Sequence, residues 1–369
     1  MIVVASCGHN CDDERIYYKQ IQTLISNDYE VKYFAYCNKT FIENEYTENI
    51  EYRFFNSTEI SQAQYKTIVF NLLKNNPPEI FHIHDMELLS VAYKLKKIHP
   101  NIKIIYDVHE DLEAMWDTFS SYSVPIKSII NFILKKYEQW FLSCVDSFIL
   151  ANKLARTTKY NNYAEVHIIE NFPLMADLKS NHKEHSAHKL IYHGQLGEDR
   201  GIITLIDAMS KLEKKYRDLE LILIGTPRNE NFKKILLKKI NESKSIKWVE
   251  QIPHKEIWEF LNEASIGIIP FHNETIWNYN TPTKLFEYMI SNCAVVASEL
   301  KPIKEFCNET ASWTTPGDME GLIEAIEYYF NNKDVYQKHR KKNVDLITNY
   351  YNWDSISKKL LNIYEDLLT

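Results

Sequence analysis

The sequence predicts an α/β protein with two doubly wound parallel-sheet domains. Three observations predict this fold. The chain has 369 residues, which is more than one ordinary core holds. Short apolar runs alternate with helical patterns from end to end, which is typical of a parallel sheet covered on both faces. The polar, aperiodic stretch 173–188 separates two such series and is expected to link them.

Hydrophobic periodicity places the elements of each half. In the first half we expect strands at 2–6, 30–36, 50–55, 79–84, 102–107, 147–151 and 166–170, and helices at 14–27, 61–75, 86–98 and 125–142. In the second half we expect strands at 189–193, 219–224, 246–250, 265–271, 294–298 and 311–315. The helices expected there are 201–215, 229–242, 254–263, 282–291, 302–307, 318–331, 333–349 and 354–368. The predicted domains are 1–172 and 189–350, with 351–369 as a separate C-terminal helix.

Composition argues against nucleic-acid binding, a disulfide framework and a membrane span. A net charge of −7 argues against nucleic-acid binding, which needs a basic footprint. The six cysteines form no Cys-x-x-Cys pair and are expected to be reduced core residues. The start of the chain, 1–6, is short and apolar without a basic region, so we expect a first strand there and no signal peptide. No apolar run reaches the ~18 residues of a membrane span, so we expect a cytoplasmic protein whose membrane contact is at most peripheral.

A glycine-containing loop at 194–201 is the most informative segment. Gly194, Gly197 and Gly201 lie within it, although the whole chain has only eight glycines and none between Gly8 and Gly194. An apolar run precedes the loop and a helical pattern follows it, which is the arrangement that points backbone N–H groups at a phosphate. The loop also carries the cation Arg200. From this segment alone, a phosphate-binding loop and a tight turn without a ligand are both open.

A second candidate segment surrounds the helix expected at 282–291. Thr281 is a suitable N-cap, and Pro282 is a suitable first helical residue. Lys284 in the first turn is unfavourable beside the positive end of the helix dipole unless an anion binds there, so we expect a phosphate at Thr281–Lys284, which includes Thr283. Glu287 lies among apolar residues and is expected to face ribose hydroxyls; the alternative is an exposed glutamate on an ordinary helix.

Together these segments resemble the C-terminal domain of retaining glycosyltransferases of the GT-B type, specifically glycosyltransferase family four. The matching motifs in the second half are Gly194-Gln195-Leu196, Arg200-Gly201, Glu287-Tyr288-Met289 and Val295-Val296-Ala297-Ser298. In the first half, the segments 12–16, 82–89 and 106–111 resemble members that build bacterial surface polysaccharides. The resemblance covers nearly the whole chain. It implies two Rossmann-like domains that face a cleft, with the C-terminal helix packing back on the N-terminal domain.

The resemblance also implies roles for individual residues. It places Gly8 and Gly194 in loops near the donor phosphates, Arg200 on the diphosphate and His109 near the transferred sugar. This sequence departs from the family pattern at two positions. Gln195 stands where a phosphate-binding arginine is usual, and Tyr279 stands where a glutamate contacts the donor sugar.

Other polar residues near strand ends are weaker candidates. His84 and Asp85 end the strand 79–84, whereas His82 is expected to be buried within it. Asp12-Asp13-Glu14 precedes a helix and is expected to cap it, so we expect no metal site there. Helix dipole and basic side chains are expected to replace a metal.

The predicted function is that of a retaining, metal-independent hexosyltransferase. The donor would be a UDP- or GDP-sugar as substrate, with no separate cofactor, and the acceptor a glycan or lipid-linked glycan in bacterial surface polysaccharide biosynthesis. Two alternatives are a sugar-nucleotide epimerase, which shares the two-domain architecture, and a GT-B-like partner protein without catalysis.

The helix expected at 125–142 has two interpretations. It is rich in apolar and aromatic residues and carries three lysines, Lys127, Lys135 and Lys136. Such a helix suits the cytoplasmic face of an anionic inner membrane. It also suits packing on the sheet with the lysines outward, which is the interpretation that we favour from the sequence. The basic run 228–247 is expected to be a solvated face.

Overall fold

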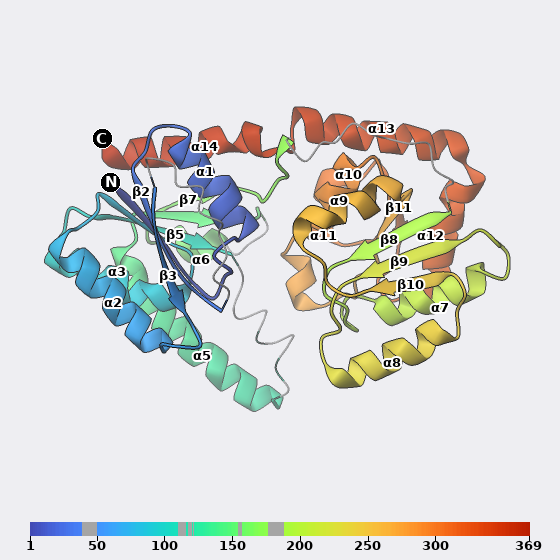
Figure 1. Cartoon of the computed structure of the whole chain (residues 1–369), viewed down its shortest axis with the longest axis horizontal. Helices are drawn as coiled ribbons and strands as arrows, with labels where there is room; N and C mark the ends of the chain where they lie inside the picture. The colour runs from blue at the N-terminus through green and yellow to red at the C-terminus, as the bar shows by residue number, and fades with distance from the viewer. Residues whose placement is uncertain (39–49, 110–115, 117–119, 121, 154–156, 176–187) are drawn as a thin grey trace. The chain divides into compact units, whose positions relative to one another are not determined.

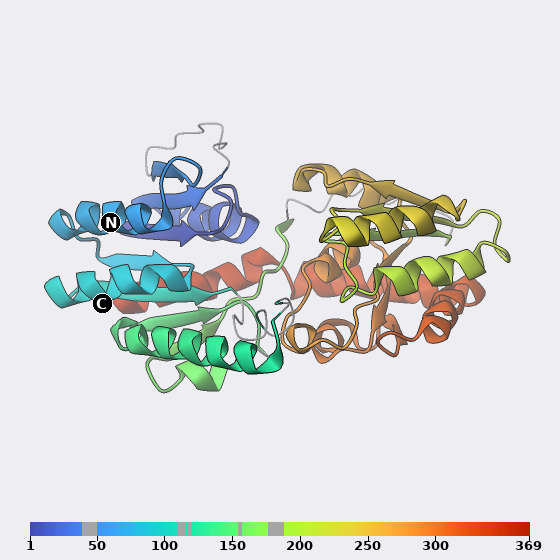
Figure 2. The same ribbon diagram turned by 90° about the horizontal axis from the view of Figure 1, so that it is seen from below.

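A computed structural model of the chain describes residues 1–38, 50–109, 116, 120, 122–153, 157–175 and 188–369. The chain divides into two compact units. Unit 1 comprises Met1–Asn171 together with Ile356–Thr369, and unit 2 comprises Phe172–Ser355. Each unit has a sheet with helices on both faces (Figures 1 and 2).

Unit 1 contains a seven-stranded sheet in the order β3-β2-β1-β4-β5-β6-β7, and every pair is parallel. Its strands are β1 (Ile2–Cys7), β2 (Val31–Cys37), β3 (Ile50–Asn56), β4 (Ile80–Ile83), β5 (Lys103–Val108), β6 (Ser147–Leu150) and β7 (Glu165–Ile168). Its helical elements are η1 (Glu14–Ile21), α1 (Gln22–Ile25), α2 (Gln62–Asn75), η2 (Met86–Leu88), α3 (Leu89–Ile98), α5 (Val124–Phe141), η3 (Leu142–Cys144) and α6 (Thr157–Tyr160). The central strands are buried along their length because helices cover both faces.

Unit 2 contains a six-stranded parallel sheet in the order β10-β9-β8-β11-β12-β13. Its strands are β8 (Lys189–His193), β9 (Glu220–Ile224), β10 (Ile246–Val249), β11 (Ile266–Ile269), β12 (Ala294–Ser298) and β13 (Ala311–Thr314). Its helical elements are α7 (Ile202–Leu212), α8 (Glu230–Asn241), α9 (His254–Glu263), η5 (Thr275–Asn278), α10 (Lys284–Ile290), α11 (Lys301–Cys307), α12 (Met319–Asn331) and α13 (Lys333–Asn349). The predicted fold class, two Rossmann-like parallel-sheet domains, is confirmed.

The strand order reverses once in each sheet. In unit 1 the reversal lies between β1 and β4, and in unit 2 between β8 and β11. In open parallel sheets a ligand binds beyond the carboxyl ends of the strands at this point. Gly8 follows β1 and Gly194 follows β8, so both loops proposed from the sequence begin at a reversal point.

The last helix, α14 (Trp353–Leu368), belongs mostly to unit 1. Tyr364 on this helix is fully buried, and its hydroxyl is 2.5 Å from Nδ1 of His82 in β4. Tyr29 also packs against the Tyr364 ring. The expectation that the C-terminal helix packs back on the N-terminal domain is therefore confirmed.

The local detail at α10 differs from the prediction. The helix begins at Lys284, two residues later than expected, and Thr283 rather than Thr281 occupies the N-cap position. The Pro282 carbonyl accepts a hydrogen bond from the N–H of Leu285, so a tight turn precedes the helix. Thr283 already has helical backbone angles and makes no capping bond with its side chain. Capping by Asp13 is confirmed, because its carboxylate accepts from the N–H groups of Arg15 and Ile16.

The 125–142 helix packs on unit 1 along one side, where Phe141 contacts Tyr93, and Lys135 and Lys136 are exposed as expected. In α5, the residue that is fully buried is Glu138, whereas large apolar side chains of the same helix are exposed. The carboxylate of Glu138 accepts a hydrogen bond from the hydroxyl of Tyr160 and pairs with Lys159, so the inner side of this helix is held partly by polar contacts. Large apolar side chains thus lie on the outward side of α5 in addition to the inner side, which the favoured interpretation did not predict.

Candidate active site

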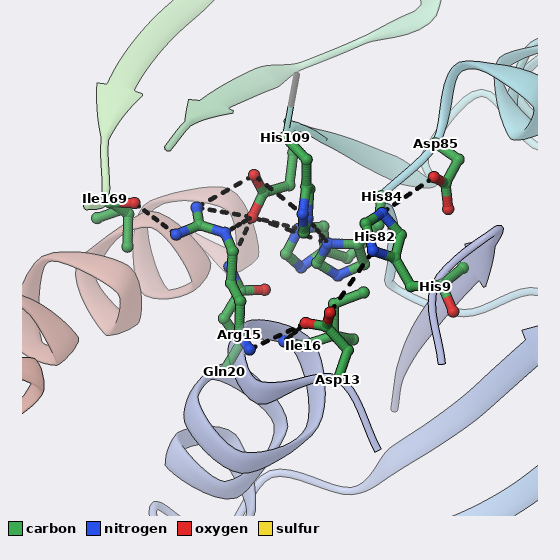
Figure 3. Close-up of polar contacts among 12 residues, drawn as sticks. His9, Asp13, Arg15, Ile16, Gln20, His82, His84, Asp85, His109 and Ile169 are labelled. Atoms are coloured by element: carbon green, nitrogen blue, oxygen red, sulfur yellow. Dashed lines mark hydrogen bonds and ion pairs between the residues drawn. The ribbon is translucent and has the colours of Figure 1, made fainter. Parts of the chain in front are cut away.

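Unit 1 has a cluster of histidines at its strand reversal point (Figure 3). His9 follows β1, His84 follows β4 and His109 follows β5. Nδ1 of His84 is 2.8 Å from Nε2 of His109, and the His9 and His109 ring centroids are 4.5 Å apart. His82, within β4, lies against His84, with ring centroids 4.4 Å apart. The strand order therefore brings together imidazoles that are distant in sequence.

A buried carboxylate lies at the centre of this cluster. Asp107 accepts hydrogen bonds from Nη2 of Arg15 at 3.1 Å and from Nε2 of Gln20 at 2.5 Å. Burial opposes ionisation of Asp107, but the Arg15 guanidinium holds its pKa below the usual value. Arg15 also donates to the carbonyl of Ile169 at 2.7 Å, so one side chain joins η1, β5 and the segment after β7.

His9 differs from the other imidazoles in its charge. Burial disfavours the imidazolium, but the carboxylates of Asp13 and Asp85 accept from the ring and raise the pKa of His9 to about 10. Burial lowers the pKa of His82 and of His109 to about 4, although Asp107 opposes this shift. The cluster at neutral pH thus holds one imidazolium beside neutral rings, of which His109 is partly accessible at 13% side-chain exposure.

Three of these groups have the composition of a metal site. Ligand atoms of His82, His84 and Asp107 lie within 4.8 Å of one another. Arg15 already neutralises the carboxylate, however, and a second cation beside its guanidinium would be repelled. The arrangement therefore suits a charge-paired histidine cluster better than a metal centre.

The lowered pKa values predict acid sensitivity. A histidine of the unfolded chain titrates near 6.5, so between pH 6.5 and 4 the unfolded state binds protons that the folded His109 does not. Stability is therefore fully present above pH 6.5 and falls by about 1.4 kcal/mol per pH unit for each such histidine as the pH decreases. Urea unfolding at pH 7, 6 and 5 measures this slope. His109→Gln is expected to flatten it, whereas the control His99→Gln, outside the cluster, should leave it unchanged. Equal slopes in all three proteins would contradict the prediction.

In unit 2 the glycine-containing loop lies against the neighbouring strand ends. Gly201 has φ +65°, and a Cβ there would lie 1.8 Å from the carbonyl oxygen of Pro270, after β11. Gly194 has φ +110°, and a Cβ there would lie 3.0 Å from Nζ of Lys284. These glycines allow a close approach, and Lys284 points its amine at the loop.

Lys284 is buried, and its amine lies beside two aromatic rings. Its Nζ lies 3.9 Å from the centroid of the Tyr192 ring and 5.2 Å from that of Phe271. Within the described residues this amine has no hydrogen-bond partner. Burial, assisted by the nearby charge of Arg200, places the pKa of Lys284 well below its usual value. Burying such a group without a partner is costly, so its position indicates a site for an anion.

Arginines surround the same loop. The Arg200 guanidinium stacks on Trp277, 4.1 Å from the ring centroid, and its Nε is 3.5 Å from Asp199. Arg228 binds the same carboxylate through Nη1 at 2.7 Å and donates through Nη2 to Oε1 of Gln195 at 3.1 Å. The predicted residues Gly194, Gln195, Arg200 and Lys284 are thus brought together.

Sequence reasoning did not identify Arg228 as a site residue. It was included only in a basic run that we expected to be a solvated face. The signal was its position a few residues after β9, because β9 lies next to β8 and their following loops must be neighbours. The N–H of Leu196 donates to the carbonyl of Thr226, and the N–H of Arg228 to the carbonyl of Leu196. These two hydrogen bonds hold the loops together and bring Arg228 next to Gln195.

Glu287 is buried and paired with two histidines of unit 2. Nε2 of His193 is 3.0 Å from one carboxylate oxygen and Nε2 of His254 is 2.7 Å from the other. Burial would raise the pKa of Glu287, but His193 and then His254 hold it below the usual range. The alternative of an exposed glutamate is therefore wrong. Neither histidine was predicted from the sequence, since β8 and α9 meet α10 only through the fold.

The remaining candidates occupy different places. Tyr279 is half-buried at the end of η5, Thr281 is half-buried and Thr283 is exposed in the turn before α10. Gly8 has φ +136° and precedes His9, so it belongs with His109 in unit 1. The candidates therefore lie on both units, and only some of those on unit 2 are in contact with the Gly194 loop.

Two doubly wound units with the strand orders given above form the fold of GT-B glycosyltransferases. Sucrose-phosphate synthase from Thermosynechococcus elongatus superimposes with a TM-score of 0.75 at 15% identity, over 99% of this chain and 98% of that one. HepE from Anabaena, solved in complex with UDP, superimposes with a TM-score of 0.71 at 13% identity, over 99% of both chains. The fold of the chain is thus that of GT-B glycosyltransferases.

The chain belongs to the family "Glycosyl transferases group 1", whose model matches residues 176–366, more than half of its length. Among curated proteins it resembles the lipopolysaccharide 1,2-N-acetylglucosaminetransferase of Salmonella typhimurium. The two are 22% identical over 279 residues, which are 72% of this chain and 68% of that protein. The chain is therefore a transferase of glycosyl groups.

Proposed function

We propose that the protein transfers a sugar from a UDP-sugar, with retention at the anomeric carbon, to a glycan or lipid-linked glycan of a bacterial surface polysaccharide. This is the activity expected of a member of glycosyltransferase family four. The observation that carries the donor class is the buried amine of Lys284, which has no hydrogen-bond partner among the described residues and points at Gly194 beside two arginines. A diphosphate would supply the missing anionic partner.

The proposed reaction relies on side-chain cations. When the bond between the sugar and the diphosphate breaks, negative charge develops on the leaving oxygen. Lys284 and Arg200 would stabilise that charge beside the loop that begins at Gly194. An approaching phosphate favours the charged amine, so Lys284 would take up a proton as the donor binds.

Glu287 is proposed to bind the ribose of the donor. Each carboxylate oxygen has two lone pairs, and one histidine contact on each leaves room for ribose hydroxyls as donors. His193 and His254 keep the carboxylate ionised and fix its orientation. In unit 1, we propose that His109 helps to position the transferred sugar and that His84 orients its ring.

Arg228 lies next to Gln195, the position at which this sequence departs from the family pattern. The guanidinium lies against the glutamine side chain, at the position where the family pattern has an arginine. We propose that Arg228 supplies the missing positive charge from the adjacent loop. This contact favours an active enzyme over a partner protein without catalysis.

The names of similar proteins suggest which donor to test first. HepE was solved with UDP, and the Salmonella protein is an N-acetylglucosaminetransferase. UDP-N-acetylglucosamine is therefore the first donor, with UDP-glucose and GDP-mannose for comparison. Titration calorimetry measures binding, and NMR of the product reports the anomeric configuration. If none of these donors binds at millimolar concentration, the proposal fails. A changed sugar nucleotide in the absence of acceptor would instead identify an epimerase.

Replacing Arg228 tests its proposed contribution. Arg228→Gln is expected to weaken UDP binding about tenfold, the loss of one charge-assisted hydrogen bond. The matched control is Arg217→Gln, which removes an exposed arginine from the same unit. Equal affinities of the two variants would remove the role assigned to Arg228.

A further inference from the structure

The outer side of α5 exposes a continuous apolar surface. Trp140 is 71% exposed, Phe132 61%, Ile129 60% and Ile133 58%. Ile126 and Tyr137 are exposed as well. Single exposed apolar residues are normal on a protein, but several large ones on one helix mark an interaction site. Among the described residues, no helix is long and apolar enough to span a bilayer, so any membrane contact of α5 would be along a surface.

Helical geometry places these residues on one side. At about 100° per residue, the six side chains fall within roughly 140° of the helix circumference. The opposite side carries Glu138, which is buried. The inner side also carries Phe141, which packs against Tyr93, so the six exposed side chains form a second, outward apolar side.

Positive charge accompanies the apolar surface. Lys135 and Lys136 are exposed, and Nζ of Lys136 lies 5.7 Å from the centroid of the Phe132 ring. Glu138 is the acidic residue of this helix, and Lys159 neutralises it. The helix surface is therefore cationic although the whole chain has a net charge of −7. This local reversal of sign is complementary to an anionic surface.

We propose that the outer side of α5 binds the surface of an anionic phospholipid bilayer, with its apolar side chains between the lipid headgroups. Trp140 and Tyr137 suit this interface because an aromatic ring with a polar group prefers the headgroup level. Long lysine side chains place their ammonium groups at the phosphates while their stems cover apolar surface. The proposal does not depend on the transfer reaction.

A second copy of the chain fits this surface less well. A two-fold contact would bring the same patch from both subunits together. Lys135 and Lys136 would then face their own copies, with repulsion that the apolar contact would have to overcome. Anionic lipid removes this conflict, because each lysine meets a phosphate.

Vesicle sedimentation with the full chain tests the proposal without a sugar nucleotide. The protein is expected to sediment with vesicles of phosphatidylglycerol and phosphatidylcholine in equal parts, and far less with phosphatidylcholine alone. The double variant Lys135→Glu/Lys136→Glu is expected to bind the anionic vesicles at least about tenfold more weakly. Trp140→Ser is expected to weaken binding by a similar factor through loss of apolar contact.

The control is Ile235→Asp in α8, another basic helix, because Ile235 is an apolar residue that is 44% exposed there. It should bind vesicles like the unchanged protein. Equal binding of the α5 variants and this control would overturn the proposal. So would concentration-dependent dimerisation that Trp140→Ser abolishes while vesicle binding is absent, because α5 would then be a contact between copies. Binding of sugar nucleotides is measured separately, so failure of one proposal leaves the other standing.

Discussion

Lys284→Met is expected to weaken UDP binding about 10- to 100-fold and to raise the free energy of unfolding. The two effects have one cause. The amine has no hydrogen-bond partner within the described part of the chain, so the folded protein without donor bears the cost of burying it. Methionine has a similar length and would pack on the rings of Tyr192 and Phe271. We expect a gain of about 1–3 kcal/mol in stability.

The loss of affinity follows from the proposed donor contact. A hydrogen bond to a charged group contributes about 1.5–3 kcal/mol, which corresponds to the stated loss. Calorimetry in buffers of different ionisation enthalpy should also detect proton uptake when the unchanged protein binds UDP. The control is Lys247→Met, because that lysine is 70% exposed and pairs with Glu220 at the surface. A Lys284→Met variant that binds UDP like the unchanged protein would exclude this lysine from the donor site.

Arg15→Met is expected to have the largest effect on stability, a loss of about 3–5 kcal/mol. The substitution leaves the fully buried carboxylate of Asp107 without its cation. It also removes the hydrogen bond to Ile169 and thus the connection between η1 and the segment after β7. A loss of this size is a large part of the stability of a typical domain. Urea unfolding measures it.

A second variant keeps this prediction testable if the first does not fold. Arg15→Met/Asp107→Asn removes both charges and should be more stable than Arg15→Met alone, since no unpaired carboxylate remains. The comparison is Lys211→Met, which breaks an exposed pair with Glu320 and should change stability by less than about 1 kcal/mol. Losses of the same size from Arg15→Met and Lys211→Met would show that Asp107 does not need its partner.

The sequence predicted the elements whose signals are local. The bounds predicted for the strand 294–298 agree with those of β12. The prediction was possible because all five residues are apolar or small, and all five are buried. Asp13 caps its helix because capping depends on the next three residues alone. The start of α10 was misplaced by two residues, since Thr281-Pro282 and Thr283-Lys284 are both plausible helix starts.

Contacts across strands could not be predicted in the same way. Arg228 reaches Gln195 only because β9 lies beside β8, and His193 reaches Glu287 because β8 lies beside β11, which α10 contacts. The exposure of large apolar side chains on α5 was not predicted either. Periodicity identifies which residues share a side of a helix, but only packing decides whether that side is buried.

The position of α14 in the chain has a consequence for synthesis on the ribosome. Tyr364 completes the environment of His82 in unit 1, yet all of unit 2, Phe172–Ser355, is translated between them. At usual elongation rates this takes roughly 10–40 s. During that time the nascent N-terminal sheet lacks the helix that covers β4 at His82. A hydrophobic surface is thus open to chaperones or to other nascent chains until α14 has been synthesised.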